Sequence, residues 1–127
     1  MIDKTQLKLF VQKTLGCNCP EEVFEHIDCR ADVNLDAEIA LDYEINIGNR
    51  LLIFAASIDQ ADSIRPILSQ LVRAGIKKRD REGFNRFRLV LLTKRPGRLA
   101  KEAFEVFDSL GVDEKAHLHV IRRLPDM

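Results

Sequence analysis

The chain of 127 residues has no apolar run that approaches the roughly 20 residues a membrane-spanning helix needs. Its first residues, MIDKTQLKLFVQK, carry charges throughout, which is not the pattern of a secretory signal peptide. It has only three cysteines, an odd number that argues against a disulfide framework and favours a reducing cytoplasm. The length suffices for one hydrophobic core, so we expect a single cytoplasmic domain over residues 1–127 with no membrane partner.

The chain also lacks net charge, with 20 basic and 20 acidic side chains, but the two signs are unevenly distributed. Residues 21–62 hold eleven acidic and two basic side chains, whereas residues 73–101 hold eleven basic and two acidic ones. Such a basic segment is typical of a protein that binds an anionic partner, and complementary surfaces of opposite sign also permit a homo-oligomer.

The N-terminal part of the chain predicts two helices. Apolar residues recur at helical spacing before Gly16, which predicts a helix over residues 3–15. Pro20 stands before a pair of glutamates and a short apolar stripe, which predicts a second helix over residues 20–28 with Cys19 near its N-cap.

The middle of the chain alternates between apolar and polar residues and then becomes continuously apolar. The stretch DAEIALDYEINI, residues 36–47, alternates strictly, so we expect a strand with one apolar and one solvated face at an edge of a sheet. Gly48-Asn49 predicts a tight hairpin turn. The run RLLIFAA, residues 50–56, is typical of a strand that is covered on both faces.

The remaining sequence predicts two helix–strand repeats. We expect a helix over 60–76, a polar connection over 77–85, a buried strand over 86–93, a helix over 96–110 and a last strand over 116–122. The fold class that follows is α/β. We expect a mixed four-stranded sheet, made of a β-hairpin followed by two right-handed β-α-β units, with helices on both faces.

Cys17 and Cys19, in the stretch TLGCNCPEEVF, are the candidate catalytic or metal-ligating residues. A position before a helix N-terminus favours a thiolate, whereas the two glutamates that follow oppose it. Three interpretations stay open: small fillers around a tight turn, thiol redox chemistry, and metal or iron–sulfur ligation. A single ion shared with Cys29 and His26 is excluded if residues 20–28 are helical, because Cys19 and Cys29 are then about 15 Å apart.

The stretches LGCNCPEEVF, GFNRFRLVLL and HLHVI, spread over most of the chain, resemble a family of small uncharacterised bacterial proteins. The resemblance implies a bacterial cytoplasmic protein and brings with it no established activity and no known cofactor. Cys29 is not part of that family's pattern.

Two basic segments are candidate binding surfaces. The stretch KKRDREGFNRFR, residues 77–88, combines cations with two phenylalanines, as single-stranded nucleic-acid binding does, and a solvated charged loop is the alternative. Its candidate contacts are Lys77, Lys78, Arg79, Arg81 and Arg86. Lys94, Arg95 and Arg98 follow a predicted parallel strand and begin a helix, a position that suits a small anion.

His117 and His119 alternate on the last predicted strand, about 7 Å apart, and such a pair either shares a metal or faces solvent. Over the whole chain, the sequence favours a thiol-redox or metal-related role at Cys17 and Cys19. The second hypothesis is a module that binds nucleic acid or another anionic partner through residues 77–101. An enzymatic interpretation depends on the two thiols alone.

Overall fold

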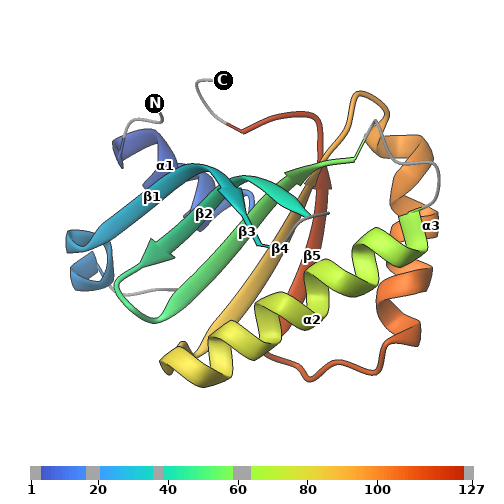
Figure 1. The fold of residues 1–127 in the computed structure, drawn as a ribbon. Coiled ribbons are helices and arrows are strands. Elements are labelled where there is room, and N and C mark those ends of the chain that lie inside the picture. The colour runs from blue at the N-terminus through green and yellow to red at the C-terminus, as the bar shows by residue number, and fades with distance from the viewer. Residues whose placement is uncertain (1–3, 17–20, 36–38, 59–63, 125–127) are drawn as a thin grey trace.

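The computed structural model describes residues 4–16, 21–35, 39–58 and 64–124. Within these ranges the chain forms α-helices, one short 3-10 helix and one sheet (Figure 1). The elements are α1 (Lys4–Lys13), η1 (Glu21–Glu25), β1 (Ile27–Asn34), β2 (Ala40–Ile47), β3 (Leu51–Ser57), α2 (Ile64–Glu82), β4 (Arg86–Leu92), α3 (Pro96–Ser109) and β5 (Ala116–Ile121). None of the helices in the described ranges has both the length and the apolar character that crossing a bilayer requires.

The strands form one mixed sheet in the order β1-β2-β3-β4-β5. The first three are antiparallel neighbours, whereas β3, β4 and β5 are parallel and are linked through α2 and α3. The predicted α/β class and mixed sheet are confirmed, but the predicted number of four strands is wrong because β1 adds a fifth. The hairpin turn between β2 and β3 holds Gly48 and Asn49, whose φ angles of +61° and +57° are the pair that a tight hairpin turn needs.

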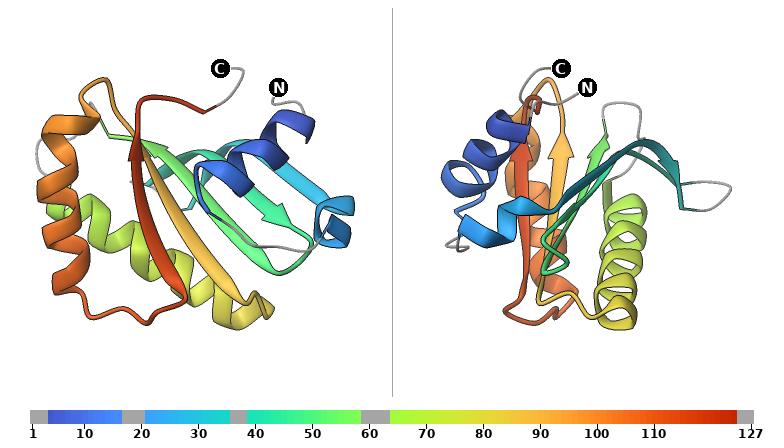
Figure 2. Two further views of the ribbon diagram at one scale, coloured as in Figure 1. Left: turned by 180° about the vertical axis from the view of Figure 1, so that it is seen from behind. Right: turned by 90° about the vertical axis from the view of Figure 1, so that its left-hand side faces the viewer.

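Helices cover both faces of the sheet, as predicted (Figure 2). On one face, which we call the α2 face, α2 and α3 bury a core cluster that includes Phe54, Leu68 and Val106. On the other, the α1 face, α1 and η1 bury a second cluster that includes Val11 and Ile53. Strands β3 and β4 lie between the two clusters and contribute to both.

The predicted helix over residues 20–28 is wrong. The described part of this segment forms the single 3-10 turn η1 and then strand β1, which begins at Ile27. Ile27 and Cys29 pack against the α1-face cluster, and β1 pairs with β2 from Ile27 opposite Ile47 onward. Pairing with the next strand along the chain, β2, therefore prevails over the local helix signal of Glu21 and Glu22, which produces only η1.

The alternating strand β2 is not at the edge of the sheet, because β1 pairs with its outer side. Its polar residues are not simply solvated either: Glu44 is buried, and Asp42 accepts hydrogen bonds from the backbone N–H and the hydroxyl of Ser57. The apolar residues also do not share one face, since Leu41 belongs to the α2-face cluster and Ile45 to the α1-face cluster. The apolar side chains change from the α2 face to the α1 face between Leu41 and Ile45, where the pairing between β2 and β3 ends.

Helix α2 is longer than predicted and continues to Glu82, across most of the expected polar connection over 77–85. Two contacts anchor the additional turns. Lys78 Nζ lies 2.7 Å from a carboxylate oxygen of Glu44 on β2, and Arg79 Nη2 lies 2.6 Å from Asp113, which precedes β5. Ion pairs with residues elsewhere in the chain thus stabilise these turns as helix, where the sequence predicted a polar connection.

Gly75 allows α2 to approach the sheet closely. A Cβ at this position would lie 2.1 Å from Cζ of Phe87, a ring that is fully buried and packs edge-to-face on Phe54 with 5.2 Å between centroids. Because the ring is held on all sides, it cannot move aside without disturbing the α2-face cluster.

Gly75→Ala is therefore expected to lower the free energy of unfolding by about 1–3 kcal/mol. Gly97→Ala is the matched control, because Gly97 lies in the first turn of α3 with nothing within 4 Å of an added Cβ. Alanine there is expected to leave stability unchanged or to raise it by up to about 1 kcal/mol. Urea unfolding of both variants measures the difference, and an equal response would contradict the close approach of α2.

Candidate anion-binding site

Cys17 and Cys19 lie outside the described residues, so their chemistry stays a prediction. Cys29 lies half-buried in β1, and burial, followed by the charge of Asp28, raises the pKa of its thiol. The helix that favoured an activated Cys19 is replaced by the five-residue η1, so the helical spacing of about 15 Å between Cys19 and Cys29 no longer serves as an argument. Among the described residues, no group of three or more His, Cys, Asp or Glu side chains is placed to hold a metal ion.

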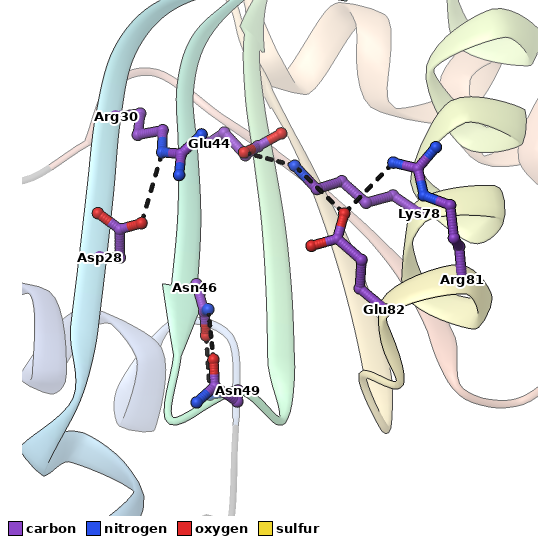
Figure 3. Close-up of polar contacts among 8 residues, drawn as sticks. All are labelled: Asp28, Arg30, Glu44, Asn46, Asn49, Lys78, Arg81 and Glu82. Atoms are coloured by element: carbon purple, nitrogen blue, oxygen red, sulfur yellow. Dashed lines mark hydrogen bonds and ion pairs between the residues drawn. The ribbon is translucent and has the colours of Figure 1, made fainter.

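Three of the five predicted nucleic-acid contacts, Lys78, Arg79 and Arg81, already have carboxylate partners. Figure 3 shows Lys78 of α2 reaching the buried Glu44 of β2 at 2.7 Å and Glu82 of its own helix at 3.9 Å. Arg81 lies 3.3 Å from Glu82 as well. In the last turns of α2, Lys78 and Arg81 are therefore neutralised by neighbouring carboxylates. They keep little unpaired charge for a binding partner.

Arg79 is the most completely paired of these cations. It is 5% exposed, donates to both carboxylate oxygens of Asp113 at 2.9 and 2.6 Å, and contacts Asp80 through Nε at 3.0 Å. Hydrogen bonding from Arg79 lowers the pKa of the Asp113 carboxyl. The two remaining predicted contacts, Lys77 and Arg86, are exposed.

The predicted anion-binding group Lys94, Arg95 and Arg98 lies past the carboxyl end of β4 and in the first turn of α3, with all three side chains exposed. Arg86 stands at the opposite end of β4. A seven-residue strand separates the two ends by about 20 Å at 3.3 Å per residue. The two basic groups therefore do not form one site.

A different cationic group forms where β4 and β5 run side by side. The odd-numbered residues of β4 and the even-numbered residues of β5 belong to the α2-face cluster, so the others project to the α1 face. Register places Arg88 opposite His117 and Val90 opposite His119. We call Arg86, Arg88, His117 and His119 the β4–β5 cluster.

The β4–β5 cluster occupies a part of the α1 face that the described helices leave open. In the left view of Figure 2, α1 lies to one side of this face, and no helix lies over the amino-terminal halves of β4 and β5. Arg86 is exposed, and His117 and His119 are half-buried. Arg88, at 9% exposed, is the most buried of the four.

Arg88 is a buried cation without a carboxylate partner among the described residues. Its Nη1 lies 3.2 Å from Nε2 of His119, and its Nε has no hydrogen-bond partner. Burial, followed by the charge of Arg86, lowers the pKa of Arg88. The charged groups that act on this guanidinium are thus positive.

Both histidines of the cluster are neutral at pH 7. Burial, followed by the charges of Arg88 and His117, lowers the pKa of His119 to about 4. Burial and the two arginines also lower the pKa of His117, although the backbone of Glu114 opposes the shift. Neutral His119 accepts the hydrogen bond from Arg88 at Nε2, which assigns its ring proton to Nδ1.

The two buried arginines of the described chain differ in what surrounds them. Arg79 has carboxylates on two sides, whereas Arg88 has one neutral imidazole and an unpaired Nε. A guanidinium binds carboxylate and phosphate groups in a bidentate way, and a buried charge without a partner is unfavourable by several kcal/mol. The arrangement around Arg88 therefore suits an oxyanion, and its positive charges disfavour the metal ion that the two histidines suggested.

Sequence reasoning found Arg86, but it assigned Arg88 to a buried strand and weighed the histidines separately. The available signal is a pair of short patterns, Arg-x-Arg in β4 and His-x-His in β5, each on a strand whose other face is apolar. Combining the two patterns requires the register between β4 and β5. That register is a long-range property, which a local pattern does not specify.

Comparison with known proteins finds no matching family model, no matching curated protein and no matching solved structure. The resemblance to small bacterial proteins stays a prediction. Function is therefore argued from the site, because a fold alone does not determine it.

Replacing each buried arginine by methionine is expected to have opposite effects on stability. Arg79→Met removes the two guanidinium donors of Asp113, which keeps only the backbone N–H of Lys115, and should lower the free energy of unfolding by about 1.5–3 kcal/mol. Arg88→Met removes a buried charge that has no counter-ion among the described residues, so stability should stay unchanged or rise by up to about 2 kcal/mol. Urea unfolding in phosphate-free buffer measures both, and a loss at Arg88 as large as that at Arg79 would show that Arg88 is a structural residue.

The neutral state of His119 predicts a dependence of stability on pH. Since the folded-state pKa of about 4 lies below the ordinary 6.5, the unfolded chain binds the proton more readily, and stability falls as the pH drops from 6.5 towards 4. The loss is at most about 3 kcal/mol. His119→Gln keeps an acceptor for Arg88 but cannot be protonated, so its stability should fall less over this range.

The measurement is the free energy of unfolding of wild type and His119→Gln at intervals between pH 7 and pH 4. His26→Gln is the matched control, because His26 is exposed and outside the β4–β5 cluster. Parallel curves for wild type and His119→Gln would contradict a buried neutral imidazole.

Proposed function

We propose that this protein is a binding module for an anionic partner, and that the partner binds at the β4–β5 cluster. The observation that carries the proposal is Arg88, which is 9% exposed, has an unpaired Nε and has no carboxylate partner among the described residues. An oxyanion at this place supplies the missing negative charge. The proposal keeps the binding module predicted for residues 77–101 but moves its centre from the end of α2 to the open face of the sheet.

The distribution of ion pairs supports this location. Three cations at the end of α2, Lys78, Arg79 and Arg81, are paired with Glu44, Asp113 and Glu82, so they serve the fold. Arg86 and Arg88 lie near each other without such partners, and each lowers the pKa of His117. An anion that approaches the open face therefore meets two positive charges.

A thiol-redox or metal-related role of Cys17 and Cys19 stays a separate prediction. The described thiol, Cys29, does not add to it, because a half-buried cysteine with a raised pKa suits a place in the core better than reactivity.

A labelled oligouridylate with a 5′-hydroxyl serves as the polyanionic probe. We expect Arg86→Gln and Arg88→Gln each to weaken its binding by about fivefold or more, because each removes a contact to phosphate. With two such contacts, the logarithm of the binding constant should fall against the logarithm of salt concentration with a slope of about −1.4, and each substitution should reduce the slope by about 0.7. Fluorescence anisotropy over a series of salt concentrations measures both quantities.

Arg65→Gln is the matched control, because it removes the same charge from an exposed position of α2 on the other face of the sheet. It should change binding by less than about twofold. The proposal fails if all three substitutions weaken binding equally, since the effect is then one of net charge and not of the β4–β5 cluster.

A further inference from the structure

We infer that the β4–β5 cluster binds one phosphate dianion, either inorganic phosphate or the terminal phosphate of an ester, in preference to the phosphodiester backbone of a nucleic acid. This inference rests on the proposed function and names the chemistry of its ligand. It follows from the unpaired edge of Arg88, from the depth of that side chain and from the charge of the cluster.

The unpaired edge of Arg88 fits two oxygens of one anion. A guanidinium presents its N–H donors in pairs along its edges. Nη1 of Arg88 is held by Nε2 of His119 at 3.2 Å, whereas Nε, which shares its edge with Nη2, has no partner. Nε itself is fully buried, so an anion meets this edge only where the neighbouring side chains move apart, and it then finds two parallel N–H groups, the arrangement that binds carboxylate and phosphate in a bidentate way.

The depth of Arg88 favours a group at the end of a molecule. Because the side chain is 9% exposed and its Nε is inaccessible to solvent, a ligand reaches the unpaired edge only by displacing the neighbouring side chains and placing its oxygens between them. A terminal phosphate enters with three unsubstituted oxygens in front. A phosphodiester carries a substituent on each side of the phosphorus, and both substituents must then fit beside Arg86 and His117.

The charge of the cluster matches a dianion. Arg86 and Arg88 carry two positive charges, and both histidines are neutral at pH 7 because burial and the arginines lower their pKa values. A phosphate monoester carries a charge of about −1.5 to −2 at pH 7, whereas a phosphodiester or a carboxylate carries a single negative charge. The third phosphate oxygen is left for Arg86, which is exposed at the rim of the cluster.

The test compares two ligands that differ in one terminal phosphate. The full chain is titrated with a short oligouridylate that carries either a 5′-phosphate or a 5′-hydroxyl, both labelled at the 3′ end and followed by fluorescence anisotropy. We expect the phosphorylated form to bind about tenfold more tightly or better. Inorganic phosphate and uridine 5′-monophosphate then compete for the site: stronger competition by the monophosphate identifies an ester as the ligand, and equal competition identifies free phosphate.

Arg88→Lys separates the paired donors from the charge, because lysine keeps the positive charge but lacks the edge of two N–H groups. The preference for the 5′-phosphate should then fall to about twofold or less. Arg98→Lys is the matched control, at an exposed position of α3 outside the cluster, and should leave the preference unchanged. If circular dichroism shows that Arg88→Lys does not fold, Arg86→Gln at its exposed position provides the comparison, since removing the second charge also reduces the preference.

The outcomes distinguish the two proposals. Equal binding of the two oligonucleotides, weakened in both by Arg86→Gln, would overturn the phosphate inference and leave the anion-binding function standing. No binding of either oligonucleotide, together with no binding of phosphate or of the monophosphate, would overturn both. Binding of inorganic phosphate or the monophosphate that Arg88→Lys weakens, with no binding of the 5′-hydroxyl form, supports both.

Discussion

The fold depends on one constraint: strand β3 is apolar on both faces, and β4 is apolar on its α2 face and over the carboxyl half of its α1 face, so both faces of the sheet must be covered there. β3 is buried from Leu51 to Ala56 and β4 from Phe87 to Leu92. The two covers are unequal. On the α2 face, a helix of 19 residues and one of 14 lie on the sheet, whereas on the α1 face the α-helix has 10 residues and is about 15 Å long. Since five strands at about 4.8 Å spacing make a wider surface than this helix covers, part of the α1 face is left uncovered by the helices of the described chain.

Along the α1 face of β4 and β5, the residues change from apolar to polar where the helices no longer cover the sheet. At the carboxyl end of β4, Val90 and Leu92 belong to the α1-face cluster, and Ile121 of β5 packs against it. Towards the amino ends of the same strands the corresponding positions are Arg88 and His117. The continuous apolar run of β4 is therefore apolar on its α2 face throughout and only partly so on its α1 face.

Inner strands and turn positions were predictable because their signals are local. The apolar runs in β3 and β4, the two positive φ angles at Gly48-Asn49 and the helix that begins at Pro96 each follow from a few adjacent residues. Strand β1 was missed because it is stabilised by pairing with β2, which its own sequence does not indicate. The glutamates of η1 gave the segment a local helix signal instead. The candidate site was missed for the same kind of reason: Arg88 and His119 are 31 positions apart, and only the parallel register brings them together.

Arg88 differs from the two cations of the basic segment that serve the fold. These two are paired with acidic residues from elsewhere in the chain: Lys78 with Glu44 and Arg79 with Asp113. An apolar side chain at Arg88 would complete the core as Val90 does, so the guanidinium there does not contribute to stability as a buried charge without a counter-ion. His119 holds it through one hydrogen bond and supplies no negative charge, whereas a carboxylate in that place would pair with Arg88 permanently, as Asp113 pairs with Arg79. In the anion-binding function that we propose, the neutral imidazole orients the cation and leaves its charge for a ligand, so that binding an anion would also remove the unfavourable free energy of an unpaired buried charge from the folded state.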